Sequence, residues 1–367
     1  MIAATPLNFE PMTLTTLAER PLFSVIVPNY NYARYVGLAI ESVLSQTYTN
    51  FEIVICDDGS TDSSREVIRQ YVNRDCRVRL IEQENRGFAS AVTTAFEAAS
   101  GDPVALLDAD DVFMPRKLEV VLAAFRKNPR SGLFANRVLP LSATGQPLGP
   151  PYPGYLEAGW LGPQKLRAGG CSTFPPTSGL SFRREVLNQL IPVPPEVTGL
   201  VDYYLSRTAQ FLAEVSFTPE SLTEYRVHGA SMSSASGSGA SPIFSSFDPK
   251  LHAACATGLE RMLLLQKRFL ARFYGADFAN ALRLEDHAGY WSVLLALRVL
   301  QGERAGTIRP YSVAEMIRHV PRPAERRLWQ ALVLLPQPLG SRMYRFWRSP
   351  SRLKSMVKTL VLPVLQR

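Results

Sequence analysis

The chain has 367 residues, and its content of 46% hydrophobic and 20% charged residues excludes a disordered or collagen-like protein. The net charge of +8 belongs to the C-terminal end, because residues 309–367 hold 12 basic and 2 acidic side chains while residues 1–308 hold 28 and 30. A body that is close to neutral argues against a chain built as a whole for binding nucleic acid.

Sequence signals for a membrane-spanning or secreted protein are missing. No apolar run reaches the roughly 18–20 residues that span a bilayer, and the first 20 residues lack the basic start and apolar core of a signal peptide. The cysteines Cys56, Cys76, Cys171 and Cys255 are widely spaced and form no CxxC pair. We therefore expect free thiols in a cytoplasmic protein.

From residue 23 onward, short apolar β-branched runs alternate with segments of helical periodicity. The pattern predicts strands at 23–28, 51–56, 78–82 and 103–107 and helices at 35–46, 62–72, 88–99 and 115–126. Such alternation indicates an α/β fold with a Rossmann-like, mostly parallel central sheet covered by helices on both faces.

After residue 132 the pattern loosens. Residues 140–176 are rich in Pro and Gly and are expected to form a long excursion on the substrate side, and residues 229–246 are rich in Gly and Ser. A strand at 178–182 and helices from 183 and at 199–212, 251–273 and 288–300 complete the prediction. We divide the chain into a lead-in (1–22), an α/β domain (23–235), a loop and helical region (236–308) and a basic amphipathic tail (309–367).

Polar residues follow each predicted strand, which is where parallel sheets bind ligands. They lie at 29–31, 57–60, 85–87 and 108–111. Asp108, Asp110 and Asp111 repel one another unless a cation or hydrogen-bond donors neutralise them, and Mg²⁺ or Mn²⁺ prefers such oxygen ligands. The alternative is a solvated acidic turn. Asp57 and Asp58 could accept hydrogen bonds from a base or ribose, or belong to an ordinary strand-to-helix turn.

These segments together resemble the family 2 glycosyltransferases, which have the GT-A fold. The resemblance rests on SVIVPNYN, SVLSQTYTNFEIVICDDGSTD, ENRG and LLDADDVFMPRKLE, in matching order over residues 23–128. TSGLSFRREVL, GLVDYYLSRTA and LTEYRVHGASMS extend it to about residue 235. It implies an inverting enzyme that moves a sugar from a nucleoside diphosphate donor, expected to be a UDP-sugar, to a hydroxyl acceptor, in polysaccharide or glycolipid assembly.

The resemblance also implies roles for single residues near the donor. Pro28 and Tyr30 match nucleotide contacts, with Tyr30 able to stack on the base, and either Asp57 or Asp58 matches the carboxylate that accepts from the base. Arg86 lies where the family often has a basic residue near the nucleotide. Asp108 and Asp110 match the DxD motif, in which Asp110 ligates Mn²⁺ or Mg²⁺ and Asp108 faces the ribose or the metal. Asp111 would support the site or orient sugar hydroxyls.

Three residues further along the chain match the family's later motifs. Asp202 matches the general base, although this chain has Val201 where many members have Glu. Its structural alternative is a carboxylate favoured by the N-terminus of a helix. Arg226 would pair with phosphate and His228 would help bind diphosphate or metal, unless His228 is only structural.

The basic tail suggests where the enzyme acts. Its arginines and lysines are interleaved with Trp329, Tyr344, Phe346 and Trp347, a composition that suits the surface of an anionic membrane better than nucleic acid. We expect a peripheral protein on the inner membrane face that acts on a glycan or lipid-linked acceptor. The alternatives are a solvated tail and, for the whole chain, a nucleotidyltransferase or a non-catalytic sugar- or lipid-binding homologue.

Overall fold

The computed structural model describes residues 9–170, 172–197, 200–228, 249–301, 312–320 and 323–348. The chain divides into a sheet unit, Met1–Lys165 with Ser172–Met232, and a helical unit, Leu166–Cys171 with Ser233–Arg367. Cys56, Cys76 and Cys255 are free, as predicted. Cys171, the Gly/Ser-rich segment 229–246 and the tail beyond residue 348 lie outside the described residues, and the predicted domain boundaries stay predictions.

The sheet unit contains one eight-stranded sheet with the order β3-β2-β1-β4-β7-β6-β8-β5. Its strands are β1 (Phe23–Asn29), β2 (Phe51–Asp58), β3 (Val78–Gln83), β4 (Val104–Leu106), β5 (Val112–Phe113), β6 (Ser131–Ser142), β7 (Leu180–Phe182) and β8 (Glu214–Val227). The first four strands pair in parallel in the order of a doubly wound half-sheet. β7 is antiparallel to β4 and β6, β8 is parallel to β6, and β5 is antiparallel to β8.

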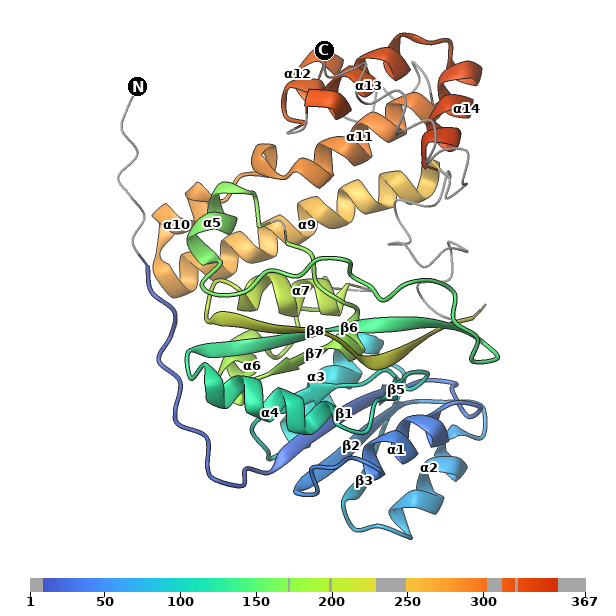
Figure 1. Ribbon diagram of the computed structural model, residues 1–367, viewed down its shortest axis with the longest axis vertical. Coiled ribbons are helices and arrows are strands. Elements are labelled where there is room, and N and C mark those ends of the chain that lie inside the picture. Colours follow the sequence, from blue (N-terminus) through green and yellow to red (C-terminus); the bar gives the residue numbers. More distant parts are fainter. Residues whose placement is uncertain are drawn as a thin grey trace. The chain divides into compact units, whose positions relative to one another are not determined.

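Helices cover both faces of the parallel half because right-handed crossovers require it. β1 leads through α1 (Val36–Leu44) to β2, and β2 through α2 (Ser64–Val72) to β3, whereas α3 (Phe88–Ala98) returns the chain to β4 on the opposite face (Figure 1). The remaining helices of this part are α4 (Lys117–Lys127), α5 (Gly162–Arg167), α6 (Arg184–Leu190) and α7 (Val201–Ala209). The predicted fold class, a mostly parallel sheet flanked by helices, is confirmed.

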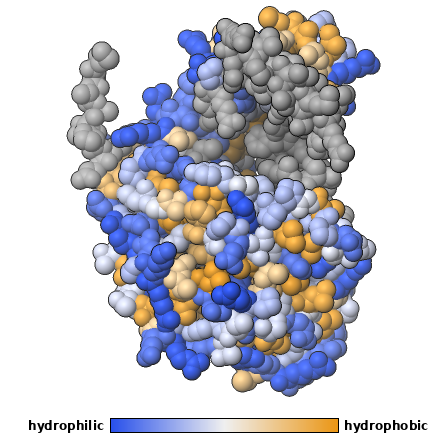
Figure 2. Space-filling view, in the orientation of Figure 1, coloured by the Kyte–Doolittle hydropathy of each residue, from blue (hydrophilic) through white to orange (hydrophobic). Residues whose placement is uncertain are grey.

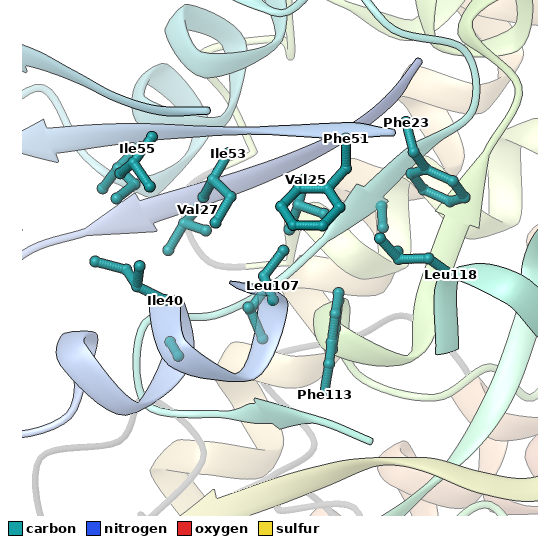
Figure 3. Close-up of a cluster of buried hydrophobic side chains, with 14 of the residues drawn as sticks. Phe23, Val25, Val27, Ile40, Phe51, Ile53, Ile55, Leu107, Phe113 and Leu118 are labelled. Carbon is teal, nitrogen blue, oxygen red and sulfur yellow. The ribbon is translucent and has the colours of Figure 1, made fainter. Parts of the chain in front are cut away.

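The main core lies between the sheet and the helices α1, α2 and α4. Alternate residues of β1 and β2, such as Val25 and Ile53, point to the same side and pack with Ile40 of α1 and Leu118 of α4 (Figure 3). All seven residues of β1 and all eight of β2 are buried. Burial on both faces explains why these strands are continuous apolar runs rather than alternating ones.

The sequence analysis, which found a loosened pattern after residue 132, missed the strands β6 and β8. β6 and β8 are 12 and 14 residues long and are the most extensively paired strands after that point. Pro140 and Pro219 interrupt their sequences, and their pairing shifts register near Asn136 and Arg137. Such irregularities break the two-residue period by which strands are recognised in a sequence.

The helical unit consists of helices in its described part. They are α9 (Pro249–Tyr274), α10 (Ala276–Ala281), α11 (Ala288–Gln301), α12 (Val313–Arg318), α13 (Pro323–Leu334) and α14 (Gln337–Arg348). The predicted helices at 251–273 and 288–300 are confirmed, and Trp291 and Trp329 are fully buried among them. Among the described residues, no helix combines the length and hydropathy needed to cross a bilayer.

The surface of the sheet unit mixes both kinds of residue. On the face shown in Figure 2, hydrophobic residues are scattered among hydrophilic ones over the sheet and its helices. Single exposed apolar residues of this kind are usual on folded proteins and need no explanation.

Candidate active site

An acidic loop, residues 108–111, follows β4 at the carboxyl end of the parallel strands. The loop is a tight turn in which the Asp111 N–H donates to the Asp108 carbonyl at 3.0 Å. Ser178, in the 3₁₀ turn before β7, accepts the Asp108 N–H at 2.9 Å. The turn is therefore held both by its own backbone and by a residue 70 positions further along the chain.

Asp111 is used to hold this loop in place. One carboxylate oxygen accepts the Arg226 N–H at 2.8 Å and the other accepts the Ser178 hydroxyl at 2.5 Å. The side chain is buried, and desolvation, then Asp110 and Asp108, raise its pKa well above the usual range. Because both oxygens bond to the protein, Asp111 ties the loop to β8 and to the turn before β7.

Lys117, which the sequence analysis missed, lies fully buried behind Asp111. Its ammonium donates to the Ser178 carbonyl and, at 3.0 Å, to the Thr223 hydroxyl, and it lies 3.9 Å from the centre of the Phe113 ring. Desolvation lowers the pKa of Lys117 well below its usual value, and Asp111 opposes this. A positive charge is unfavourable at the N-terminus of a helix. The lysine in the first turn of α4 was therefore the sequence signal that pointed to a special role for Lys117.

Asp108 and Asp202 come together from distant segments. Desolvation raises the pKa of Asp108 well above the usual range, and Asp110 and Asp202 raise it further against the effects of hydrogen bonds with Thr177 and Ser178. The Asp108 Oδ1 atom is buried without a hydrogen-bond partner. Asp202 lies in the first turn of α7, where its carboxylate accepts the Tyr203 N–H at 2.8 Å. Desolvation also raises the pKa of Asp202, against the effects of this hydrogen bond and of Arg207.

Asp110 contacts an aromatic and basic cluster beside the loop. Its Oδ2 lies 2.9 Å from Nε2 of His228, and the His228 ring stacks on Tyr35 with centroids 4.8 Å apart. The Arg226 guanidinium donates to the Asp110 carbonyl at 3.1 Å and lies 5.3 Å from the Tyr35 ring centre. Burial and then Asp110 raise the pKa of Tyr32 far above its usual value, which places this phenol near the acidic loop.

A cleft of about 370 Å³ opens next to this cluster. It is lined by Asn31, Tyr32, Arg34, Tyr35, Asp62, Ala143 and His228. Four of the lining residues, Asn31, Tyr32, Arg34 and Tyr35, come from the segment after β1, and Tyr35 and His228 also belong to the cluster beside Asp110.

Asp57 and Asp58 both bond within the protein. Asp57 accepts the Asn29 amide at 2.7 Å and the Ser60 hydroxyl and N–H at 2.6 and 3.0 Å. Asp58 accepts the N–H groups of Arg86 and Gly87 at 2.9 and 2.8 Å, and the Gln83 amide at 2.6 Å. These bonds fix the turns after β1, β2 and β3 relative to one another.

The remaining nucleotide candidates differ in accessibility. Pro28 is buried in β1, whereas Tyr30 is 43% exposed and able to stack on a ligand. The Arg86 side chain is exposed and donates to Gln83 at 3.0 Å. Gly59 is required in its turn, since its φ is +73° and an added Cβ would lie 2.8 Å from the Asn85 nitrogen.

The acidic loop fits a hard divalent cation. The unpartnered Asp108 Oδ1 and the Asp110 carboxylate are oxygen donors of the kind that Mn²⁺ and Mg²⁺ prefer. Within the described ranges, no group of three or more His, Cys, Asp or Glu side chains is arranged as a metal site. A cation here would need further oxygen ligands from outside the protein, such as phosphate and water.

The structure thus gathers the predicted residues into two adjoining groups. The first contains the acidic loop, Asp202 and the cluster around Tyr35; the second is the set of turns held by Asp57 and Asp58. Tyr32 joins the groups, because its backbone N–H donates to Ser64 at the start of α2. Besides Lys117, the sequence analysis missed Tyr32, Tyr35 and Ser178, and the aromatic spacing in NYNYARY was the signal for the tyrosines.

Comparison with known proteins identifies similar chains. Residues 24–190 match the family model described as Glycosyl transferase family 2. The chain is 39% identical over 225 residues to an uncharacterized glycosyltransferase of Nostoc sp., and the match covers 58% of this chain and 67% of that protein. It is also 39% identical over 116 residues to the Escherichia coli UDP-Glc:alpha-D-GlcNAc-diphosphoundecaprenol beta-1,3-glucosyltransferase WfgD, covering 31% of this chain and 45% of that protein.

Solved structures give a weaker match. S. aureus TarS 1-349 in complex with UDP-GlcNAc has a TM-score of 0.49 and 17% sequence identity, covering 91% of this chain and 92% of that chain. The chain therefore spans two thirds of the Nostoc relative, less than half of the E. coli enzyme and most of the TarS fragment.

Proposed function

Since the chain belongs to glycosyl transferase family 2, we propose that it transfers a sugar from a nucleoside diphosphate donor to a hydroxyl acceptor with inversion at the anomeric carbon. The observation that carries this proposal is the proximity of half-buried Asp202 to Asp108, which also lies beside Asp110 and whose Oδ1 is buried without a hydrogen-bond partner. A carboxylate for proton abstraction and carboxylates for a diphosphate-bound cation are thereby present in one site.

Donor binding is assigned to the two residue groups of the site. Tyr30 would stack on the base, in the turns held by Asp57 and Asp58. Asp108 and Asp110 would hold Mn²⁺ or Mg²⁺, and the bound cation would neutralise charge on the leaving diphosphate. Arg226 and His228, next to Asp110, would contact diphosphate oxygens. Asp111 is assigned a positioning role, because both of its oxygens bond within the protein.

Asp202 is proposed as the general base. Burial makes its carboxylate more basic, so it can accept the proton of an acceptor hydroxyl while the oxygen attacks the anomeric carbon. The bond from that carbon to the diphosphate breaks in the same displacement, which inverts the configuration. Removal of this base is expected to lower turnover by about 10²–10⁴-fold.

The substrate classes follow from the relatives. WfgD is named for a UDP-Glc donor and a diphosphoundecaprenol-linked GlcNAc acceptor. We propose a UDP-sugar donor and a lipid-linked glycan acceptor for this chain, at the inner surface of a membrane and in polysaccharide or glycolipid assembly. The match to WfgD covers 31% of this chain and 45% of that protein, so each of these assignments goes beyond what the matched region shows.

Two other functions fit the site less well. A nucleotidyltransferase needs a Gly-rich, Lys- or Arg-bearing phosphate loop after β1, but residues 29–35 read NYNYARY and contain no glycine. A non-catalytic sugar- or lipid-binding homologue would have no use for a carboxylate at Asp202, where partial burial opposes its charge and raises its pKa.

A donor-hydrolysis screen tests the proposal. Purified protein is incubated with UDP-, GDP- and dTDP-sugars and Mn²⁺ or Mg²⁺, and release of the nucleoside diphosphate is measured. We expect turnover of at least one donor, lost in Asp202→Asn and retained in Asp286→Asn, a matched change at an exposed position. Turnover that survives in Asp202→Asn would overturn the assignment of the base.

A further inference from the structure

Helix α14 packs on the helical unit through a face of small and aromatic residues. Gly340, Ser341 and Tyr344 are buried on that face, and the Tyr344 ring lies 5.5 Å from the ring of Trp329 in α13. The spacing of these three residues, at positions 340, 341 and 344, defines one side of an α-helix. The opposite side would ordinarily be polar.

The opposite side of α14 instead carries a line of large apolar residues. Leu339, Met343 and Phe346 are 48%, 45% and 43% exposed. Their spacing of four and then three residues places them on a single stripe. Leu334, at the end of α13 and 84% exposed, lies close to this stripe in sequence. An aligned stripe, unlike apolar residues scattered singly, indicates a surface that contacts a partner.

Arginines lie on one side of the stripe, with Arg342 about 60° and Arg345 about 120° from Leu339 around the helix axis. Arg342 and Arg345 are both exposed, and α14 contains no acidic residue. At 100° per residue, Arg342 lies on the side away from the buried face. The surrounding segment, residues 309–367, contributes 12 basic and 2 acidic side chains. The surface therefore offers apolar anchors beside positive charge, which complements an anionic lipid headgroup layer.

We propose that α14 docks flat on an anionic membrane surface. Leu339, Met343 and Phe346 enter the boundary between headgroups and acyl chains, and Arg342 and Arg345 contact anionic headgroups. The docking would hold the enzyme where a lipid-linked acceptor resides. Only this purpose of the docking rests on the proposed function. Binding itself needs neither donor nor metal, so the two proposals can fail separately.

Nucleic acid is a poorer partner for this surface. A helix that follows a phosphate backbone uses basic residues and has no need of an exposed apolar stripe. Such binding would respond to the arginines and not to the apolar residues.

Co-sedimentation of the full chain with lipid vesicles tests the docking. The vesicles contain phosphatidylcholine with about 30% phosphatidylglycerol, or phosphatidylcholine alone. The stripe variant is Leu339→Gln/Met343→Gln/Phe346→Gln, the charge variant is Arg342→Gln/Arg345→Gln, and Leu148→Gln/Leu264→Gln changes two exposed leucines elsewhere as the control. A truncation after residue 348 and a short DNA duplex complete the set.

We expect the wild-type chain and the control variant to bind the anionic vesicles. The stripe and charge variants should each lose about tenfold or more in vesicle affinity, and removing the anionic lipid should do the same. All full-length variants should keep donor turnover within about twofold of wild type, which shows that they fold.

Three results would overturn the docking. The first is a stripe variant that binds vesicles like wild type. The second is loss of vesicle binding in the truncation alone, which would assign the anchor to residues 349–367. The third is tighter binding of the wild-type chain and the stripe variant to DNA than to vesicles, which would favour nucleic acid as the partner.

Discussion

Replacing Asp108 by Asn should stabilise the metal-free protein while abolishing its turnover. The Asp108 carboxylate is half-buried with Asp110 and Asp202 nearby, and its Oδ1 atom is buried without a hydrogen-bond partner. Leaving a buried polar atom unpaired costs about 1–3 kcal/mol, and more when the group is charged. The amide carries no charge to desolvate, so we expect the free energy of unfolding to rise by about 1–3 kcal/mol at neutral pH.

The gain should depend on pH in a defined direction. The pKa of Asp108 in the folded chain lies above its ordinary value of 3.8, so the folded state binds this proton more tightly than the unfolded state does. Ionisation therefore removes stability as the pH rises from the unfolded pKa through the folded one. The difference between the variant and wild type should be small near the unfolded pKa and largest above the folded pKa.

Urea-dependent hydrogen exchange of β1 and β4, measured in EDTA, reports the stability of the sheet unit. Asp62→Asn is the matched control, because the Asp62 carboxylate has hydrogen-bond donors where the Asp108 Oδ1 has none. Asp62 accepts the N–H groups of Ala33 and Ser64, both at 2.9 Å. Desolvation opposes ionisation of Asp62, but its hydrogen bonds outweigh this effect and lower its pKa. That variant should lose about 1–3 kcal/mol. The reasoning fails if Asp108→Asn also loses stability, or if its gain is the same in acid as at neutral pH.

Three further changes test the roles of Ser178, Asp202 and Gly59. Ser178→Ala removes the hydroxyl that joins the Asp108 N–H to Asp111. The free energy of unfolding in urea should fall by about 2–4 kcal/mol, and the Mn²⁺ concentration for half-maximal donor hydrolysis should rise. An unchanged Mn²⁺ requirement would contradict this expectation. Asp202→Asn should lower kcat about 10²–10⁴-fold with a donor KM within about twofold, whereas a changed KM alone would assign Asp202 to binding. Gly59→Ala should cost about 1–3 kcal/mol because of its φ of +73°, and an unchanged melting temperature would show that the turn adapts.

Much of the fold was predictable because its first half obeys simple rules. The strands β1, β2 and β4 contain buried apolar runs, and parallel sheets place ligands at the carboxyl ends of their strands. That rule alone located Asp57, Asp58 and the acidic loop. The other half of the sheet was less predictable, because β6 and β8 contain prolines and register shifts that hide their period.

The contacts made by the supporting residues of the site could not be predicted from local sequence. Ser178 contacts Asp108 across 70 positions and Lys117 contacts Thr223 across 106, and neither pair leaves a spacing pattern in the chain. The same holds for the roles of Asp57 and Asp111. Their carboxylates look like ligand contacts in the sequence, but the structure engages them with protein donors from other elements.

The stereochemistry of donor hydrolysis shows whether Asp202 drives a single displacement at the anomeric carbon. A donor with α configuration, selected by the hydrolysis screen, is added with Mn²⁺, and the anomeric protons of the released sugar are followed by NMR before mutarotation. A single displacement by a hydroxyl or water activated by Asp202 predicts that the β-anomer appears first. Initial release of the α-anomer would contradict the proposed mechanism.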